Sequence, residues 1–295
     1  MDMSTNRYDN PCGDDQGSVS VIIPAYNEET SIGACLRSLR EQGCGPLEII
    51  VVDDGSSDGT VAMARSFGVT VLRQDHRGMA ASRNLGARRA GGTILVMIDA
   101  DMILAPDYVE RITAPIRRGE TVATDHWNER VANWDNPWAR CQTWVLNYPD
   151  GRRQPVTAPP SSGQYRAVTR DFFLNCGGLT ESEGYRADTS IARRTGVFAA
   201  IVEDAICYHR NIETPGEVFR EARWHGRQIA YVRKGRLRRC IVTALRDKNP
   251  LRVLARGFYL ALVKREPRML LYVIYYTAGF DWGMIDALFR RYYQK

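Results

Sequence analysis

Residues 51–60 read V-V-D-D-G-S-S-D-G-T, and residues 94–101 read I-L-V-M-I-D-A-D. Each is a short apolar run that leads into aspartates, with helical and strand-like patterns between the two runs. In the second run Asp99 and Asp101 stand two apart, and such side chains on extended backbone point the same way. Carboxylates held that close repel unless one is protonated or a cation lies between them. A divalent metal that holds a diphosphate is therefore the simplest prediction.

Outward from these two runs, the chain alternates short apolar segments with helical patterns. Strands are predicted over 19–23, 47–52, 69–72, 94–98 and 201–209, and helices over 32–39, 61–67 and 79–90. Asp58 is predicted as the N-cap of the second helix. Alternation with short links indicates an α/β fold with a doubly wound, mostly parallel, Rossmann-like sheet. Ligands of such sheets bind outside the carboxyl ends of the strands, where Pro24, Asp53 and Asp99 fall.

The second half of the chain has a different texture. Tryptophans at 127, 134, 138 and 144 stand among polar residues and prolines within 106–156, which favours a lid or an acceptor face over more sheet. Residues 154–163 are predicted as a flexible loop, and 214–232, 241–264 and the stretch from 269 onward as helices. The predicted organisation is a disordered arm over 1–18, one domain over 19–210 and a basic helical extension over 211–295.

Composition and charge restrict the function classes. Hydrophobic residues at 44% and charged residues at 25% are ordinary for a globular chain of 295 residues. The seven cysteines are scattered and form no CxxC pair, which favours reduced thiols over a disulfide framework or a zinc site. The N-terminus is polar and does not resemble a signal peptide. We therefore expect a cytoplasmic protein.

The net charge of +6 conceals an asymmetry. Residues 205–295 contain 19 Lys and Arg against 7 Asp and Glu, whereas residues 1–204 contain 21 against 27. A basic C-terminal third indicates an anionic partner, such as a membrane surface, a lipid phosphate or nucleic acid. No nucleic-acid recognition motif is present, so we predict no nucleic-acid partner and a peripheral position at the inner face of the cell membrane.

Four motifs together resemble those of the GT-A glycosyltransferases of family two. They are V-I-I-P-A-Y-N-E-E, V-V-D-D-G-S-S-D-G-T, A-S-R-N-L-G-A and I-D-A-D, in this order and spacing, and the resemblance covers roughly Val19 to His209. It implies an inverting enzyme that uses a nucleotide-diphosphate sugar and Mg²⁺ or Mn²⁺. The implied nucleotide-binding residues are Pro24, Ala25, Tyr26, Glu28, Asp53, Asp54, Arg83 and Asp99, and the implied metal ligands are Asp99 and Asp101.

Each of these assignments has a structural alternative. Asp53 or Asp54 could cap the turn before Gly55. Arg83 could be a surface helix residue whose stem lies along the sheet. Asp99 and Asp101 could simply be a solvated strand end.

The candidate catalytic base is Asp188. The family presents its base in a G-E-D-T-D-L-x-x-R context, and the matching segment here reads R-A-D-T-S-I-A-R-R. Ala187 replaces the usual glutamate and Ser190 the second aspartate, so the acidic neighbours of the base are missing. An intact Glu-Asp pair occurs at Glu203-Asp204, on a predicted strand, and we interpret it as structural.

Two further features of the C-terminal part carry functional predictions. His209 lies where the family has a histidine that can ligate the metal, although an ordinary hydrogen-bonding role is the alternative. F-R-E-A-R-W-H-G-R, from Phe219, partly resembles the Q-R-x-x-R-W signature of processive members but lacks its glutamine, which favours single addition. Arg220, Arg223 and Arg227 lie three and four apart on one helical face. These arginines and the neighbouring Trp224 are the predicted contacts to the acceptor or the diphosphate. A solvated basic face is the alternative.

The stretch from Met269 to Phe280 is the most apolar in the chain. It is shorter than the roughly 20 residues that a membrane-spanning helix needs, and basic residues flank it. It is either an interfacial helix at a membrane or a helix packed on the domain or in a homodimer interface.

The leading hypothesis is a metal-dependent inverting glycosyltransferase that uses a nucleotide-sugar donor. The predicted acceptor is a glycan or a lipid-linked saccharide in cell-surface glycan assembly. The alternative is a nucleotide-sugar-binding protein that has lost transfer, because Ala187 and Ser190 depart from the family pattern. A nucleotidyltransferase is disfavoured, because P-A-Y-N-E-E is not the Gly-rich basic loop that such an enzyme has after its first strand.

Overall fold

The computed structural model describes residues 17–45, 47–232 and 250–293. It has two compact units, each described by itself. The first comprises the chain up to Glu129 together with Thr157–Tyr208, and the second comprises Arg130–Val156 and the chain from His209. Residues 130–156, predicted within the first domain, thus group with the C-terminal helices. Residues 1–16 of the predicted arm and 241–249 of a predicted helix lie outside the described residues.

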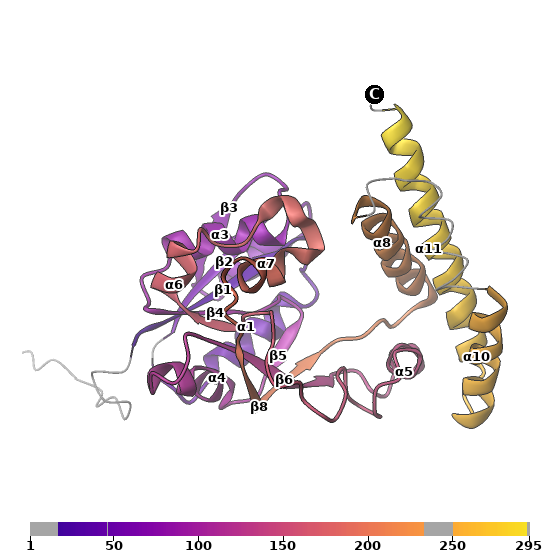
Figure 1. The fold of residues 1–295 in the computed structure, drawn as a ribbon, viewed down its shortest axis with the longest axis horizontal. Helices are drawn as coiled ribbons and strands as arrows, with labels where there is room; N and C mark the ends of the chain where they lie inside the picture. Colours follow the sequence, from indigo (N-terminus) through magenta and orange to yellow (C-terminus); the bar gives the residue numbers. More distant parts are fainter. Residues whose placement is uncertain (1–16, 46, 233–249, 294–295) are drawn as a thin grey trace, which may run out of the picture. The chain divides into compact units, whose positions relative to one another are not determined.

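An eight-stranded sheet forms the centre of the first unit (Figure 1), and its strands lie in the order β3-β2-β1-β4-β7-β6-β8-β5. Strands β1, β2, β3 and β4 are parallel, whereas β7 runs antiparallel to β4 and to β6. The strand bounds are β1 Val19–Ala25, β2 Glu48–Asp53, β3 Thr70–Arg73, β4 Ile94–Met97, β5 Met102–Leu104, β6 Ala123–Val131, β7 Ala167–Thr169 and β8 Ala200–His209. The predicted mostly parallel GT-A-like sheet is confirmed.

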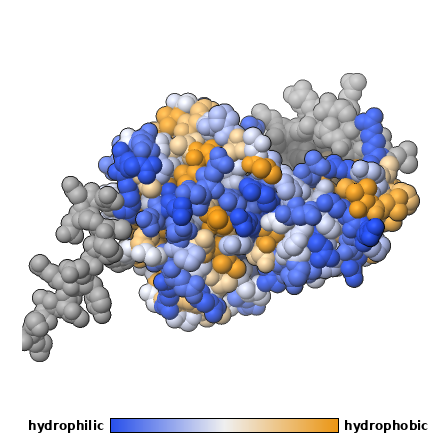
Figure 2. Space-filling view, turned by 90° about the horizontal axis from the view of Figure 1, so that it is seen from below, coloured by the Kyte–Doolittle hydropathy of each residue, from blue (hydrophilic) through white to orange (hydrophobic). Residues whose placement is uncertain are grey.

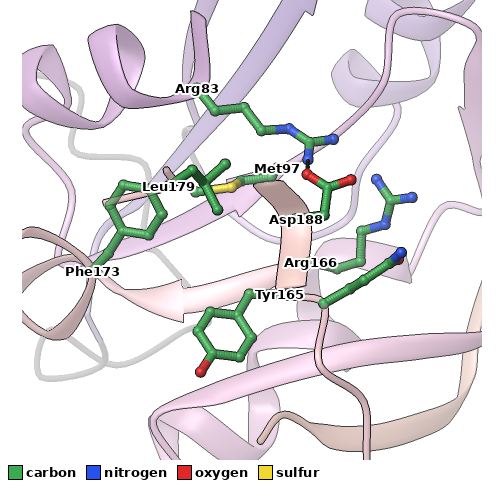
Figure 3. Close-up of a pocket in the computed structure, with 8 residues that line it drawn as sticks. Arg83, Met97, Tyr165, Arg166, Phe173, Leu179 and Asp188 are labelled. Atoms are coloured by element: carbon green, nitrogen blue, oxygen red, sulfur yellow. Dashed lines mark hydrogen bonds and ion pairs between the residues drawn. The ribbon is translucent and has the colours of Figure 1, made fainter. Parts of the chain in front are cut away.

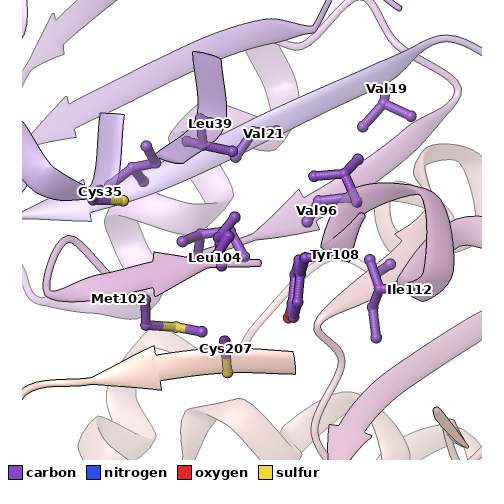
Figure 4. Close-up of a cluster of buried hydrophobic side chains, with 14 of the residues drawn as sticks. Val19, Val21, Cys35, Leu39, Val96, Met102, Leu104, Tyr108, Ile112 and Cys207 are labelled. Atoms are coloured by element: carbon purple, nitrogen blue, oxygen red, sulfur yellow. The ribbon is translucent and has the colours of Figure 1, made fainter. Parts of the chain in front are cut away.

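Helices cover both faces of this sheet, because successive strand residues are apolar on both sides. Val21 and Ile23 of β1 belong to one buried cluster and Ile22 to another, as the two-residue period of a strand requires. The first cluster also contains Cys35, Leu39, Tyr108 and Ile112 from two helices (Figure 4). The helices of this unit are α1 Ile32–Arg40, α2 Thr60–Ser66, α3 Met79–Arg89, α4 Tyr108–Arg117, α6 Arg170–Asn175, the 3₁₀ helix η1 Glu181–Thr189 and α7 Ser190–Thr195.

The prediction that 106–156 holds no further strand was wrong for β6. The buried side chains at the start of this strand include Thr124, Asp125 and His126, so no apolar alternation marks it. Their polar groups have partners inside the fold: His126 Nδ1 lies 2.7 Å from the hydroxyl of Tyr108, and Thr124 donates to a helix carbonyl. A strand whose buried side chains are polar cannot be recognised from the alternation of apolar and polar residues.

The predicted cap of α2 is displaced by one residue. Gly59 is the N-cap residue, and it has no side chain that could cap the helix. Asp58 Oδ1 nevertheless accepts from the backbone N–H of Thr60 at 3.0 Å. The carboxylate therefore satisfies a first-turn donor from one position further out.

The second unit is helical, with α5 Pro137–Val145, α8 Pro215–Val232, α10 Pro250–Val263 and α11 Arg268–Tyr293. Asn136 caps α5 by accepting from Trp138 N at 2.8 Å. Trp144, and the partly buried Trp134 and Trp138, pack in the hydrophobic cluster of this unit. Within the described residues, no helix is both long enough and apolar enough to cross a bilayer.

Helices α8 and α11 cross in backbone contact at three glycines. A methyl group placed on Gly283 would lie 2.0 Å from the carbonyl oxygen of Arg223, and one on Gly279 2.4 Å from that of Phe219. On the other helix, a methyl on Gly226 would lie 2.1 Å from the carbonyl oxygen of Phe280. Any side chain here would push the two helices apart.

We predict that Gly283→Ala lowers the free energy of unfolding by about 1–3 kcal/mol, because the added methyl group collides with backbone that cannot move away as a side chain would. Urea unfolding followed by circular dichroism measures the change. Gly216→Ala is the matched control on α8, because its methyl group would make only an ordinary 3.5 Å contact with Arg220. Equal losses of stability in the two variants would contradict the close backbone contact between α8 and α11 at Gly283.

Candidate active site

Four charged side chains from distant parts of the first unit meet beyond the carboxyl end of β4. Arg83 of α3 donates from Nη2 to Asp99 Oδ1 and from Nη1 to Asp188 Oδ1, both at 2.6 Å. Arg166, which precedes β7, donates from Nη1 to Asp99 Oδ2 at 2.9 Å. The predicted metal ligand Asp99 and the predicted base Asp188 are therefore joined through one guanidinium. Figure 3 shows the contact between Arg83 and Asp188.

The two arginines of these ion pairs are almost fully buried, and the two aspartates are partly buried. The side chains of Arg83 and Arg166 are 5% and 13% exposed, and Asp99 and Asp188 are 26% and 22% exposed. Burial lowers the pKa of Arg166, but the carboxylates of Asp99 and then Asp125 raise it more, so its pKa lies well above the ordinary value. Arg166 thus stays charged and fixes the orientation of Asp99.

A small pocket lies beside the Arg83–Asp188 pair. Polar groups form one side of it, and Met97, Phe173 and Leu179 lie together on the other (Figure 3). Asn84 ties this region to α3, since its side chain donates to the carbonyl of Leu179 at 2.9 Å and accepts from the N–H of Leu179 at 2.8 Å. The complete lining is Arg83, Met97, Gln164, Tyr165, Arg166, Phe173, Leu179 and Asp188.

The negative charges of Asp101, Asp99 and Glu28 act on the Cys35 thiol of α1. Burial raises the pKa of this thiol, and the three charges raise it further. No three His, Cys, Asp or Glu residues within the described part of the chain form a ready-made metal site. Mg²⁺ is typically held by one or two carboxylates plus substrate phosphates, and the carboxylate oxygens of Asp99 and Asp101 fit that kind of site.

Asp53 and Asp54 are buried and hold loops together. Asp53 accepts from Ser56 N at 3.2 Å and from Arg73 Nε at 3.0 Å. The carboxylate of Asp54 accepts from the N–H groups of residues 77 and 78 and from Gln74 Nε2 at 2.7–2.9 Å, and lies 2.9 Å from His76 Nδ1. The turn-capping role that the sequence left open is therefore present for Asp53.

The loop after β1 carries the remaining predicted nucleotide contacts. Pro24 and Ala25 pair with β2, and the carbonyl of Ala25 accepts from Asp54 N at 2.8 Å. Tyr26 is exposed, and its ring centroid lies 4.2 Å from that of His76. Asn27, which the sequence analysis did not single out, has φ of 57° and accepts from Ser57 N at 2.9 Å. A non-glycine residue held in the left-handed region is a recurrent feature of ligand-binding loops.

The residues that replace the family's acidic neighbours are packed inside the fold. Ala187 is buried in a hydrophobic cluster, where a glutamate would need a partner. The Ser190 hydroxyl accepts from Thr180 N at 3.0 Å. Arg194, which follows the predicted base in the sequence, donates to the carbonyls of Cys176 and Gly178 at 2.9 and 2.6 Å. These contacts fix the segment that carries Asp188.

The Glu203-Asp204 pair lies on β8, away from these groups. The Asp204 side chain is 62% exposed and pairs with Arg111 of α4, which also donates to Asp107 at 2.6 Å. This surface ion pair agrees with the structural interpretation of Asp204.

The other predicted residues belong to the second unit. The carbonyl of His209 accepts from Ala132 N at 2.9 Å, and its side chain acts electrostatically on Glu221. Arg223 and Arg227 both pair with Asp286 of α11, at 3.4 and 2.6 Å. Arg220 lies 3.8 Å from Glu217, and Trp224 is 46% exposed.

Residues 20–176, more than half of the chain, match the family model described as Glycosyl transferase family 2. The chain belongs to this family. Among curated relatives of the family 2 chain, the putative glycosyltransferase EpsH of Bacillus subtilis is 38% identical over 100 residues, which are 32% of this chain and 29% of the relative. The matches to the first four curated relatives span only 14–36% of those proteins' lengths.

Solved structures share the fold of the family 2 chain. The mannosyltransferase PcManGT from Pyrobaculum calidifontis, solved with GDP-Man and Mn²⁺, superposes with a TM-score of 0.56 at 20% identity, over 90% of this chain and 88% of that one. TarS 1-349 of S. aureus, solved with UDP-GlcNAc, superposes with a TM-score of 0.53 at 17% identity, over 94% and 92%. At such identities these likenesses establish the fold alone.

We predict that Arg166→Met destabilises the protein by about 2–3 kcal/mol. Breaking a buried ion pair costs about 3–5 kcal/mol. A smaller loss is expected here, because Asp99 keeps its hydrogen bond from Arg83 and its partial access to water. Arg111→Met, at an exposed surface pair, is the control and should change the stability much less, because exposed ion pairs are weak. Urea unfolding at neutral pH compares them, and equal losses would show that Arg166 is not a buried support of Asp99.

A pH effect is expected from Glu221 of α8. Burial raises its pKa above 4.5 despite the opposing charge of Arg153 and a hydrogen bond from Gln142. The folded state therefore binds this proton more tightly than the unfolded state, and its contribution to stability is lost as pH rises from about 4.5 through the folded-state pKa. Glu221→Gln should raise the thermal midpoint at neutral pH and leave it unchanged at pH about 4. A uniform shift at both pH values would contradict the ionisation argument.

Proposed function

We propose that this family 2 protein transfers a sugar from a nucleoside-diphosphate donor to a hydroxyl group of a glycan or lipid-linked saccharide, with inversion. The observation that carries the proposal is the double hydrogen bond of Arg83 to Asp99 and Asp188. It holds a candidate metal ligand and a candidate base within reach of one reacting centre. Family membership and structural neighbours solved with nucleotide sugars support the choice of donor.

The nucleoside would lie against the loops that follow β1 and β2. The exposed ring of Tyr26, next to His76, offers a surface on which a base can stack. Asp53 holds Ser56, and Asp54 holds Gln74, Arg77 and Gly78, through hydrogen bonds. Pro24, Ala25 and Glu28 complete the edge of this loop.

The diphosphate would lie near Asp99 and Asp101, where Mg²⁺ or Mn²⁺ would be held by carboxylate and phosphate oxygens. The metal, when bound, neutralises charge on the leaving diphosphate. Arg166 keeps Asp99 in place for this contact. Arg83 donates to Asp99 and to Asp188, and its second role would be to contact the phosphate oxygens.

Asp188 would accept the proton of the acceptor hydroxyl. One of its oxygens accepts from Arg83, and among the described residues no hydrogen bond to the other oxygen is found. As the acceptor oxygen bonds to the anomeric carbon, the bond from that carbon to the diphosphate oxygen breaks and the electron pair leaves with the diphosphate. The proton goes to Asp188, and the arrangement of one base opposite the leaving group gives inversion.

Asp188→Asn should lower transfer by about 10²–10⁴-fold, because the amide cannot take the proton. Release of nucleoside diphosphate is measured over a panel of UDP-, GDP- and dTDP-sugars with the full chain. Asp101→Ala should lower turnover and weaken its dependence on Mn²⁺ concentration.

Asp204→Asn is the matched control, since Asp204 is an aspartate on the surface of the same unit and should leave turnover unchanged. Full activity of Asp188→Asn, or equal loss in Asp204→Asn, would remove Asp188 as the base.

A binding protein without transfer activity is the second candidate. Ala187 in the core and Ser190 in a backbone hydrogen bond leave Asp188 without the usual acidic neighbours. Calorimetric binding of a nucleotide sugar with no turnover on any acceptor would favour this candidate.

A further inference from the structure

Helix α11 exposes a continuous apolar face opposite the one that packs on α8. Buried residues Tyr272, Phe280 and Met284 lie on its inner side. The exposed face consists of Leu271, Ile274, Tyr275, Ala278, Trp282 and Ile285. These positions recur at three- and four-residue intervals, so they form one stripe about 20 Å long. No charged residue lies within the stripe.

Helix α10, which packs beside α11, has a similar stripe. A methyl group on Gly257 of α10 would lie 2.6 Å from Val273 of α11, so the two helices are in close contact. The exposed apolar residues of α10 are Leu254, Phe258, Tyr259, Leu262 and Val263. Figure 2 shows hydrophobic surface gathered at the end of the second unit where α10 lies. A soluble monomer rarely exposes so much apolar area without a use for it.

Positive charges accompany these stripes. Arg252 and Arg256 are exposed on α10, and Arg265 and Arg268 are exposed where the chain passes from α10 to α11. Tyr259, Tyr275 and Trp282 are the amphipathic aromatic residues that favour the boundary between water and lipid. Arginines on α10 and between the two helices outnumber Asp281, the half-buried carboxylate beside the α11 stripe. This surface therefore complements an anionic bilayer, whereas a second copy would bring the same positive charges together.

We propose that the exposed faces of α10 and α11 bind the surface of an anionic lipid bilayer, with the helices lying in the interface. Neither helix is long and apolar enough to cross the bilayer. Leu271, Ile274 and Trp282 would enter the acyl boundary while the arginines contact lipid phosphates. This surface deepens the proposed function, because it would bring a lipid-linked acceptor to the protein.

Flotation of the full chain with phosphatidylcholine vesicles, with and without phosphatidylglycerol, tests the proposal. We expect binding to the anionic vesicles that weakens with added salt. The double variant Ile274→Glu with Trp282→Glu should bind at least about tenfold less, because two apolar anchors are replaced by charges. Phe198→Glu is the matched control in the first unit, because Phe198 and Trp282 are each 54% exposed. It should float as the unchanged protein does.

Circular dichroism and thermal unfolding confirm that the variants fold, and light scattering gives the oligomeric state. Equal flotation of both variants, or equal binding to neutral and anionic vesicles, would overturn the proposal. A dimer that the double variant abolishes, without vesicle binding, would assign the face to a second copy instead. Flotation needs no sugar donor, so failure of lipid binding and failure of the proposed transfer are distinguishable.

Discussion

The site of this protein depends on the placement of one guanidinium between two carboxylates. Asp99 and Asp188 come from segments far apart in the sequence, and two negative groups near one another in a partly buried place would repel. Arg83 removes that repulsion by donating to both at 2.6 Å. Its helix can supply this contact because α3 lies close on the sheet, where a methyl group on Gly86 would lie 2.5 Å from Ile22.

Much of this arrangement could be predicted from the sequence, since three of the four motifs lie at the carboxyl ends of strands and the fourth lies in α3. Asp99 and Arg83 belong to recognisable motifs, and the segment that carries Asp188 matches the family pattern even though Ala187 and Ser190 depart from it. The structure gives a physical reason for that departure. The position of Ala187 is a core position, and the serine hydroxyl is used by a backbone N–H.

Other parts could not be predicted, for reasons that lie in particular residues. Arg166 belongs to no motif and precedes a strand of only three residues, Ala167–Thr169, so nothing local marks it as the second partner of Asp99. Strand β6 was missed because its buried residues include polar ones. The crossing of α8 and α11 was missed because single glycines in a helical pattern do not reveal which backbone approaches them.

The hydrogen bonds of Asp54 have a thermodynamic consequence for ligand recognition. Its two oxygens hold the backbone N–H groups of Arg77 and Gly78 and the side chain of Gln74, so residues 74–78 are ordered before any small molecule arrives. Loop ordering on association generally costs free energy. Here folding has already restricted residues 74–78. The protein therefore loses less conformational entropy when a ligand contacts this segment. Differences in affinity among ligands would then reflect the shape and charge of each ligand rather than a rearrangement of residues 74–78.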